Sequence, residues 1–170
     1  MISKKMENSL NQQLNRELYS SYLYLSMATY FENINLVGMS KWMRIQAEEE
    51  HIHSMKLFDF IHKIGGRVVL EQINKPQLDW ESPKKAFQEA LAHEEYITKN
   101  INELTDLAIE ERDHSTRTFL QWYVDEQVEE EAVANEIVQK FNLIDDSKSG
   151  LYMLDQELGA RIASPVTVAK

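Results

Sequence analysis

The chain has very few residues that force a helix to end, with only 5 glycines and 3 prolines in 170 residues. Turn and helix-stop signals fall at Asn33-Ile34-Asn35, at Gly65-Gly66 and at Arg112-Asp113-His114. A strong start signal is Ser82-Pro83, an N-cap residue followed by proline at the first helical position. Turn signals this far apart are too few for the many turns of a sheet protein, so the sequence predicts an all-α fold of long helices.

Four long helices and one short helix account for most of the chain. We predict them over residues 3–33, 37–64, 83–111, 115–143 and 150–160. The short links after the first and third helices make each of those pairs antiparallel neighbours. The link after the second helix, centred on residues 67–81, is about 17 residues long and reaches roughly 55 Å when extended. A helix of about 28 residues is roughly 42 Å long, so this link can cross the whole bundle and leave the second and third helices parallel.

The predicted fold is therefore a four-helix bundle over residues 1–145 with one long crossover. Residues 146–170 add the short fifth helix and a tail to the same single domain. Each long helix carries one line of residues at spacings of three and four, the pattern of a helix facing a bundle core. The four lines are Leu10, Leu14, Glu17, Ser21, Tyr24, Ala28, Phe31; Met39, Met43, Gln46, Glu50, His53, Leu57, Phe60, Ile64; Phe87, Ala90, Glu94, Ile97, Ile101, Leu104, Ala108; and Thr116, Leu120, Tyr123, Gln127, Glu130, Ala134, Ile137, Phe141.

Each line is apolar at both ends and polar near the helix midpoint, so acidic groups from all four helices converge on one level of the core. Burying even one unpaired charge costs several kcal/mol, and the lines contain no Lys or Arg. Two divalent cations would neutralise four carboxylates. Carboxylates with one imidazole suit iron or manganese. The residues at this level are Glu17, Glu50, His53, Glu94, Gln127 and Glu130.

The spacing Glu50-x-x-His53 places a carboxylate and an imidazole on one helix face, about one turn apart. A ligating imidazole usually has its second nitrogen held by another group. We expect Gln127 or a neighbouring carboxylate to hold it.

These motifs resemble the ferritin-like di-iron proteins, which are bundles with a long crossover, and are most similar to the bacterial non-haem ferritins. The resemblance covers essentially the whole chain. It implies one iron held by Glu17, Glu50 and His53, and a second held by Glu50, Glu94 and Glu130, with Glu50 bridging. It also implies a third, weaker iron site and a tyrosine near the oxidation centre. The residues concerned are Glu49, Glu126 and Glu129 for the third site and Tyr24 for the tyrosine.

The chain departs from other branches of that class in two places. The tetrad Gln127-x-x-Glu130 stands where the symmetrical members have a second Glu-x-x-His, which argues against bacterioferritins and radical-generating reductases. His51 stands where bacterioferritins have a haem-ligating methionine, so we expect no haem.

The implied function is iron storage with ferroxidase activity. Fe(II) is oxidised by dioxygen or peroxide, and the ferric product is kept in a hollow shell of twenty-four subunits. Independently of the resemblance, the first helix is apolar beyond its core line, which predicts burial by a neighbouring subunit. The additional residues are Leu18, Tyr22, Leu25, Leu23, Met27 and Tyr30. The short fifth helix is expected to line a symmetry contact.

The composition of the chain excludes several other classes of function. The chain has no cysteine, which excludes thiol catalysis, disulfides and iron–sulfur clusters. A net charge of −10 with no basic patch argues against nucleic acid. No apolar run is long enough to span a membrane, and no secretory signal is visible, so we expect a cytoplasmic protein.

Two other functions remain open from the residues alone. A di-iron oxidase acting on an organic substrate would need a substrate cavity beside the metals. A non-catalytic helical interaction protein would use the acidic level as a specificity device and would bind no iron. Runs such as Glu48-Glu49-Glu50 are, taken singly, more often solvated surface than ligands.

Overall fold

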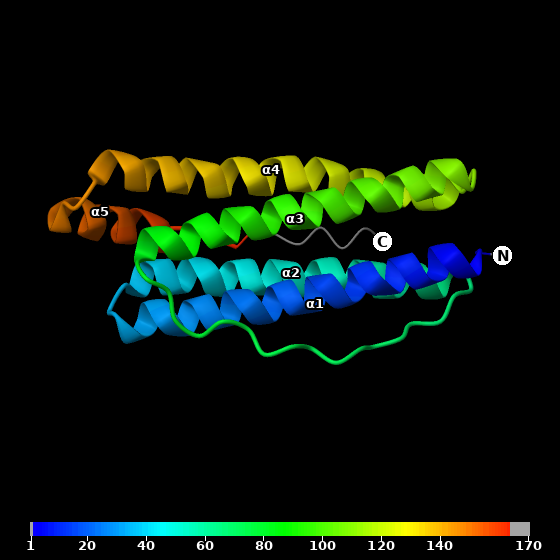
Figure 1. The fold of residues 1–170 in the computed structure, drawn as a ribbon, viewed down its shortest axis with the longest axis horizontal. Coiled ribbons are helices and arrows are strands. Elements are labelled where there is room, and N and C mark those ends of the chain that lie inside the picture. The colour runs from blue at the N-terminus through cyan, green and yellow to red at the C-terminus, as the bar shows by residue number, and fades with distance from the viewer. Residues whose placement is uncertain (1, 164–170) are drawn as a thin grey trace.

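The computed structural model describes residues 2–163. Within this range the chain forms five helices, four of them long and side by side (Figure 1). They are α1 (Lys4–Asn33), α2 (Val37–Lys63), α3 (Pro83–Glu110), α4 (His114–Ile144) and α5 (Lys148–Gly159). The predicted all-α bundle with a short fifth helix is confirmed.

Helix ends fall where capping chemistry places them. Pro83 is the first residue of α3, and the side chain of Ser82 accepts the backbone N–H of Lys85 at 3.1 Å. Ser147 caps α5 in the same way, so α5 begins two residues before the predicted Gly150. At Arg112, between α3 and α4, the backbone has a positive φ of 57°, which allows the tight reversal there.

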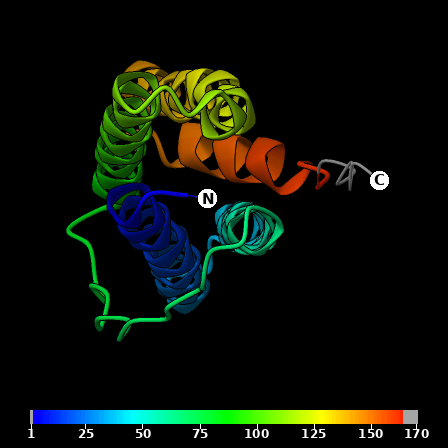
Figure 2. The same cartoon turned by 90° about the vertical axis from the view of Figure 1, so that its right-hand side faces the viewer.

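The crossover between α2 and α3 runs along α1 for most of the length of the bundle (Figures 1 and 2). Three α1 side chains four residues apart, Glu7, Asn11 and Asn15, accept backbone N–H groups of crossover residues two apart, at 2.7–2.9 Å. The spacings match, because four helical residues advance about 6 Å and two extended residues about 6.6 Å. The extended segment is thus fixed by hydrogen bonds, and it leaves α2 and α3 parallel, as predicted.

The apolar core consists of two clusters, one toward each end of the bundle. One packs Phe31, Trp42 and Phe87 with Leu154 and Leu158 of α5, which lies at the bundle end between α2 and α4 (Figure 1). The other includes Leu10, Leu57, Ile101, Leu120 and Tyr123. The positions between the two clusters along the four helices hold buried polar residues, which gives the core a polar level in its middle. They are Glu17, Glu50, His53, Glu94 and Gln127.

The extra apolar residues of α1 are covered differently from the prediction. Leu23, Met27 and Tyr30 are buried within the chain itself. The crossover provides part of this cover, with the ring of Trp80 at 5.3 Å from that of Tyr30. Expecting a neighbouring subunit to cover this line was therefore wrong, since the chain covers it. Tyr22 and Leu25, on the other line, remain 48% and 45% exposed.

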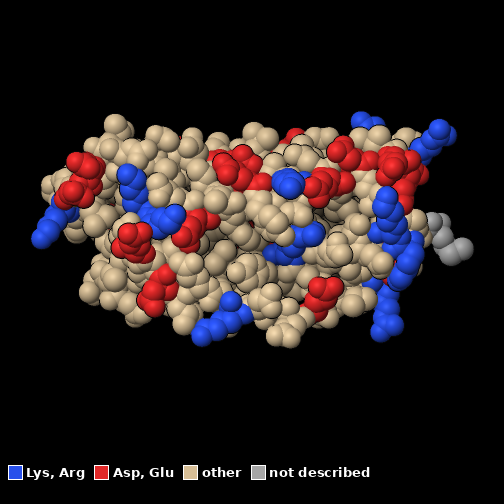
Figure 3. Space-filling model, viewed as in Figure 1, with Lys and Arg blue, Asp and Glu red and all other residues tan. Residues whose placement is uncertain are grey.

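Figure 3 shows acidic and basic side chains interspersed over the face formed by α1, α3 and the crossover, with neutral surface between them. Among residues 2–163, no helix combines the length and the apolar character that crossing a membrane requires.

Candidate metal centre

Side chains from all four long helices meet at the polar level of the core. Glu17 of α1, Glu50 and His53 of α2, and Glu94 of α3 are each no more than 4% exposed. Glu130 of α4 is only partly buried as a residue, yet its Oε2 atom is inaccessible to solvent. These side chains therefore meet at the level that was predicted from the polar residues near the midpoints of the four helices.

Ligand-type atoms at this level form two overlapping groups in which all atoms lie within 4.8 Å of one another. One group combines Glu17, Glu50 and His53, and the other combines Glu50, Glu94 and Glu130. Glu50 belongs to both. A third group joins His53 and Glu130 to Glu126, a combination that the sequence did not predict.

Amide side chains satisfy only part of this acidic cluster. Gln13 donates to Glu17 at 2.7 Å, and Gln46 donates to both Glu50 and Glu130 at 3.0 and 2.9 Å. Two other oxygens of the cluster, Oε2 of Glu17 and Oε2 of Glu130, are buried without a hydrogen-bond partner. Since a buried carboxylate oxygen without a partner is costly, these atoms fit a site that binds a cation or a proton.

Burial raises the pKa of every carboxyl group in the cluster. It raises the pKa of Glu50 to about 7 and that of Glu94 to about 8, and the charge of Glu50 adds to the effect on Glu94. For Glu17 and Glu130 the pKa lies well above the ordinary value, again through burial first and the charge of Glu50 second. Near neutral pH the cluster therefore holds protons that a divalent cation would displace.

His53 lies at one side of the cluster, its Nδ1 atom 3.5 Å from Oε2 of Glu50. The rings of Trp122 and Tyr123 pack edge-on against the imidazole at centroid distances of 5.2 and 6.2 Å. Gln127 does not take the place predicted for it beside His53. Its amide donates to the backbone and carboxylate oxygens of Glu94 and to Thr98, each at 3.3 Å.

Tyr24 is buried beside the cluster, and its hydroxyl donates a hydrogen bond to Oε1 of Glu94. Burial, together with the charge of Glu94, holds the pKa of Tyr24 well above its usual range. The phenol therefore keeps its proton and acts as a donor at neutral pH.

A cavity of about 230 Å³ opens beside the cluster between α2 and α4. The three additional acidic residues predicted from the sequence, Glu49, Glu126 and Glu129, line it together with Glu94 and Glu130. Arg161 also lines it and pairs with Glu49 at 2.5 Å. No sequence pattern indicated Arg161, because its position depends on how the short α5 packs against α2.

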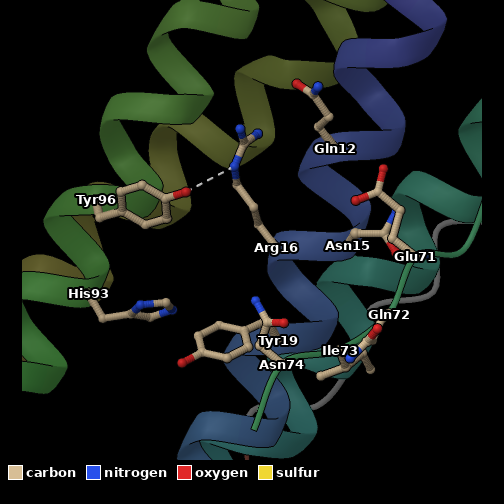
Figure 4. Close-up of a pocket in the computed structure, with 10 residues that line it drawn as sticks. All are labelled: Gln12, Asn15, Arg16, Tyr19, Glu71, Gln72, Ile73, Asn74, His93 and Tyr96. Atoms are coloured by element: carbon tan, nitrogen blue, oxygen red, sulfur yellow. Dashed lines mark hydrogen bonds between the residues drawn. The ribbon is translucent and has the colours of Figure 1, made fainter. Parts of the chain in front are cut away.

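A larger cavity, of about 550 Å³, lies apart from the carboxylates between α1, α3 and the crossover (Figure 4). Arg16 donates to the hydroxyl of Tyr96 there at 3.2 Å. His93, on its inner side, hydrogen-bonds Ser20 at 2.7 Å, and burial lowers the pKa of this imidazole to about 4. No residue that lines this cavity belongs to any of the three groups of potential metal ligands described above.

The chain matches known proteins over nearly its whole length. The family model of the ferritin-like domain matches residues 7–144. A bacterial non-heme ferritin of Bacteroides fragilis is 39% identical over 95% of this chain and 100% of its own length. One of Campylobacter jejuni is 38% identical over 92% of this chain and 93% of its own. Among solved structures, an open pore ferritin from the archaeon Archaeoglobus fulgidus superposes with a TM-score of 0.94 at 52% identity, covering 95% of this chain and all of that one.

Proposed function

The chain belongs to the ferritin-like family, and on that premise we propose that it is an iron-storage protein that oxidises Fe(II) at the central carboxylate cluster. The observation that carries the proposal is the set of buried carboxylate oxygens, on Glu17 and Glu130, that have no hydrogen-bond partner. Four buried carboxyl groups face one another there, and two divalent cations would both supply the missing partners and balance the charge.

We assign Fe(II) as the substrate of this site, held by carboxylate oxygens and one imidazole nitrogen. Glu17, Glu50 and His53 are the proposed ligands of one ion, and Glu50, Glu94 and Glu130 those of the other. The geometric support is that each of these two sets has ligand atoms within 4.8 Å of one another and that Glu50 lies in both. Tyr24 and Gln127 act on the second set by holding Glu94 in place.

The proposed reaction balances with dioxygen or with peroxide as the oxidant. Two Fe(II) ions give one electron each. With two protons, dioxygen becomes hydrogen peroxide, or hydrogen peroxide becomes two waters. The carboxyl protons that the cations displace supply acid beside the reacting ions. The chain's contribution is to place the two ions side by side and to balance their charge.

The cavity beside the cluster favours ion transport over an organic substrate. Five glutamates line it, Glu49, Glu94, Glu126, Glu129 and Glu130. So many carboxyl groups in one lining attract cations, whereas sites for organic molecules are lined mainly by apolar side chains with few charged groups. We propose Glu49, Glu126 and Glu129 as a further, weaker iron position on the route by which Fe(III) leaves the cluster.

We also propose that the subunits form a hollow homo-oligomeric shell of twenty-four copies that holds the ferric mineral. The relatives named ferritin support this, and so does the exposed pair Tyr22 and Leu25 on α1, which offers apolar surface to a neighbour. The fifth helix is proposed to line a symmetry contact.

The test is the rate of aerobic Fe(II) oxidation in variants of two proposed ligands, the bridging Glu50 and Glu130. Glu50→Ala and Glu130→Ala should lower the initial rate by at least about 100-fold, since loss even of an outer-shell partner costs up to that factor. The matched control is Glu48→Ala, which removes an exposed acid two positions before Glu50 and should leave the rate unchanged. Fast oxidation retained in Glu50→Ala would refute the assignment.

A further inference from the structure

Arg161, two residues beyond the end of α5, reaches across to α2 and makes three contacts there. Its Nη2 atom donates to Oε2 of Glu49 at 2.5 Å and its Nη1 atom to Oε1 of Gln46 at 3.0 Å. The guanidinium also lies over the ring of Trp42, 4.4 Å from the centroid. The side chains of Arg161 and Glu49 are only 22% and 15% exposed, so this charge pair is largely shielded from solvent.

The contact with Gln46 connects Arg161 to the central cluster. The carbonyl oxygen of Gln46 accepts from the guanidinium, while its amide nitrogen donates to Glu50 and Glu130. Arg161 thereby fixes the orientation of this amide, with its donor toward the carboxylates. The Arg161 guanidinium therefore acts both on Glu49, in the lining of the cavity, and, through Gln46, on the central cluster.

The guanidinium occupies Oε2 of Glu49, an oxygen that a divalent ion bound by Glu49 would also use. Glu49, Glu126 and Glu129 line one cavity. Burial raises the pKa of Glu50 and that of Glu126; the charges of Glu49 and Glu126 add to the effect on Glu50, and those of Glu129 and Glu49 add to the effect on Glu126. The charges of these acids therefore influence one another, and Arg161 places a permanent positive charge beside them. A divalent ion binding there must either displace the guanidinium or bear its repulsion.

The attachment of α5 allows Arg161 to move without the helix. Asp155 accepts the backbone N–H of Met39 at 2.9 Å, and Lys41 donates to the carbonyl of Gly159 at 2.8 Å. Both anchors precede Arg161 in the chain, and residue 161 lies outside the helix. The side chain can therefore leave Glu49 while α5 stays docked.

We propose that Arg161 is a built-in competitor for the cation position at Glu49. While Arg161 holds Glu49, a third cation has to compete with the guanidinium for that carboxylate. A divalent ion that takes Glu49 releases Arg161 from Gln46 and Trp42. This inference rests on the proposed function, because it concerns the third ion on the route to and from the cluster. Arg161 is a positioning residue, which sets how tightly that ion is held.

The test is anaerobic equilibrium dialysis of the full-length, metal-free protein against Zn(II), a redox-inert probe. Arg161→Gln should bind the third equivalent per subunit about tenfold more tightly than the wild type, the factor expected when a charge-assisted hydrogen bond no longer competes. Arg161→Lys keeps the positive charge but cannot donate to Glu49 and Gln46 at the same time as a guanidinium does. Its affinity for the third equivalent should therefore lie between those of the wild type and Arg161→Gln. The matched control is Lys41→Gln, which loosens the same end of α5 without touching Glu49 and should behave as wild type.

Two further measurements make the result specific. Glu49→Gln should remove the third equivalent in both the wild-type and the Arg161→Gln background. In the wild type, binding of the third equivalent should also change the fluorescence of Trp42, because Arg161 leaves its ring. The Trp42 contribution is identified as the emission that is lost in Trp42→Phe. In Arg161→Gln the third equivalent should leave this emission unchanged. Equal third-equivalent affinity in wild type and Arg161→Gln would overturn the proposal. Failure to oxidise Fe(II), or to bind the two equivalents that do not depend on Glu49, would instead count against the proposed function. The affinity of the equivalent that Glu49→Gln removes, compared between the wild type and Arg161→Gln, would still decide the role of Arg161.

Discussion

Tyr24 of α1 donates a hydrogen bond to Glu94 of α3, across 70 positions of the chain. The other oxygen of Glu94 accepts from Gln127, so both of its oxygens have partners. Glu17 and Glu130 each keep one buried oxygen without a partner. The four carboxyl groups of the cluster are thus not equivalent. Glu94 is held in place, while Glu17 and Glu130 keep free oxygens that a cation can bind.

Replacing Tyr24 by Phe should make cation binding require a higher pH. The hydrogen bond from Tyr24 lowers the pKa of Glu94, opposing the larger effect of burial, so its loss lets that pKa rise further. A hydrogen bond to a charged group contributes about 1.5–3 kcal/mol, which corresponds to a shift of about one pH unit or more. The measurement is the pH midpoint of Zn(II) binding at the two tight sites.

Tyr123→Phe is the matched control for this variant. It removes another buried hydroxyl near the cluster, one that donates to the backbone carbonyl of His53 at 2.6 Å rather than to Glu94. Its midpoint should stay within a few tenths of the wild-type value. If both variants shift the midpoint equally, the Tyr24–Glu94 hydrogen bond has no special role.

The metal-free protein should lose stability as the pH rises. The pKa values of Glu50 and Glu94, about 7 and about 8, lie above the value of 4.5 for an ordinary glutamate. Above pH 4.5 the unfolded chain releases these protons while the folded protein retains them, so the free energy of unfolding falls until the pH passes about 8. Urea unfolding of the metal-free protein at intervals from pH 5 to pH 9 measures this slope.

Neutral variants and added metal separate this effect from the titration of surface acids. The double variant Glu50→Gln with Glu94→Gln should lose most of the slope, because neither amide titrates. Zn(II) at pH 8 should restore stability to the wild type far more than to the double variant. A slope that the double variant retains would place its origin elsewhere in the chain.

A methyl group at Gly38 should displace α5. A Cβ atom there would lie 1.8 Å from the carbonyl oxygen of Asp155, which is backbone and cannot move without the helix. Gly38→Ala should therefore lower hydrogen-exchange protection in α5 and weaken the contact of Arg161 with Glu49. Gly65→Ala is the comparison: its φ of +80° strains alanine, but the surrounding space is open, so roughly 1–2 kcal/mol of stability should be lost with α5 unchanged. Full α5 protection in Gly38→Ala would contradict this packing.

The features predictable from the sequence are those set by local spacing. Helix ends followed from capping residues such as Ser82 and from the shortage of glycine and proline. The meeting of Glu17, Glu50, His53, Glu94 and Glu130 followed from periodicity, because helices of similar length that share a core bring their midpoints to one level. Most polar residues in these lines are buried in the bundle interior, and Ser21 and Glu130 are partly buried.

The contacts that could not be predicted depend on packing between distant segments. Arg161 meets Glu49 across 112 positions only because α5 packs beside α2. Gln127 could face either Glu94 or His53 from its place on α4, and spacing along one helix does not decide between them. Similarly, Leu23, Met27 and Tyr30 appeared to need a second subunit, since nothing in the periodicity of α1 indicates that the crossover lies along it.

Oxidation and storage of iron by this protein are tested together by aerobic addition of Fe(II) to the purified metal-free protein. The absorbance of Fe(III) is followed in time, and the iron retained per subunit is measured after size exclusion. We expect a rapid phase that consumes about two Fe(II) per subunit, matching the two overlapping groups that share Glu50. Many more irons should then be retained in one large particle. Oxidation that ends at two irons on a small oligomer would contradict storage, and a rate equal to that of buffer alone would contradict the site itself.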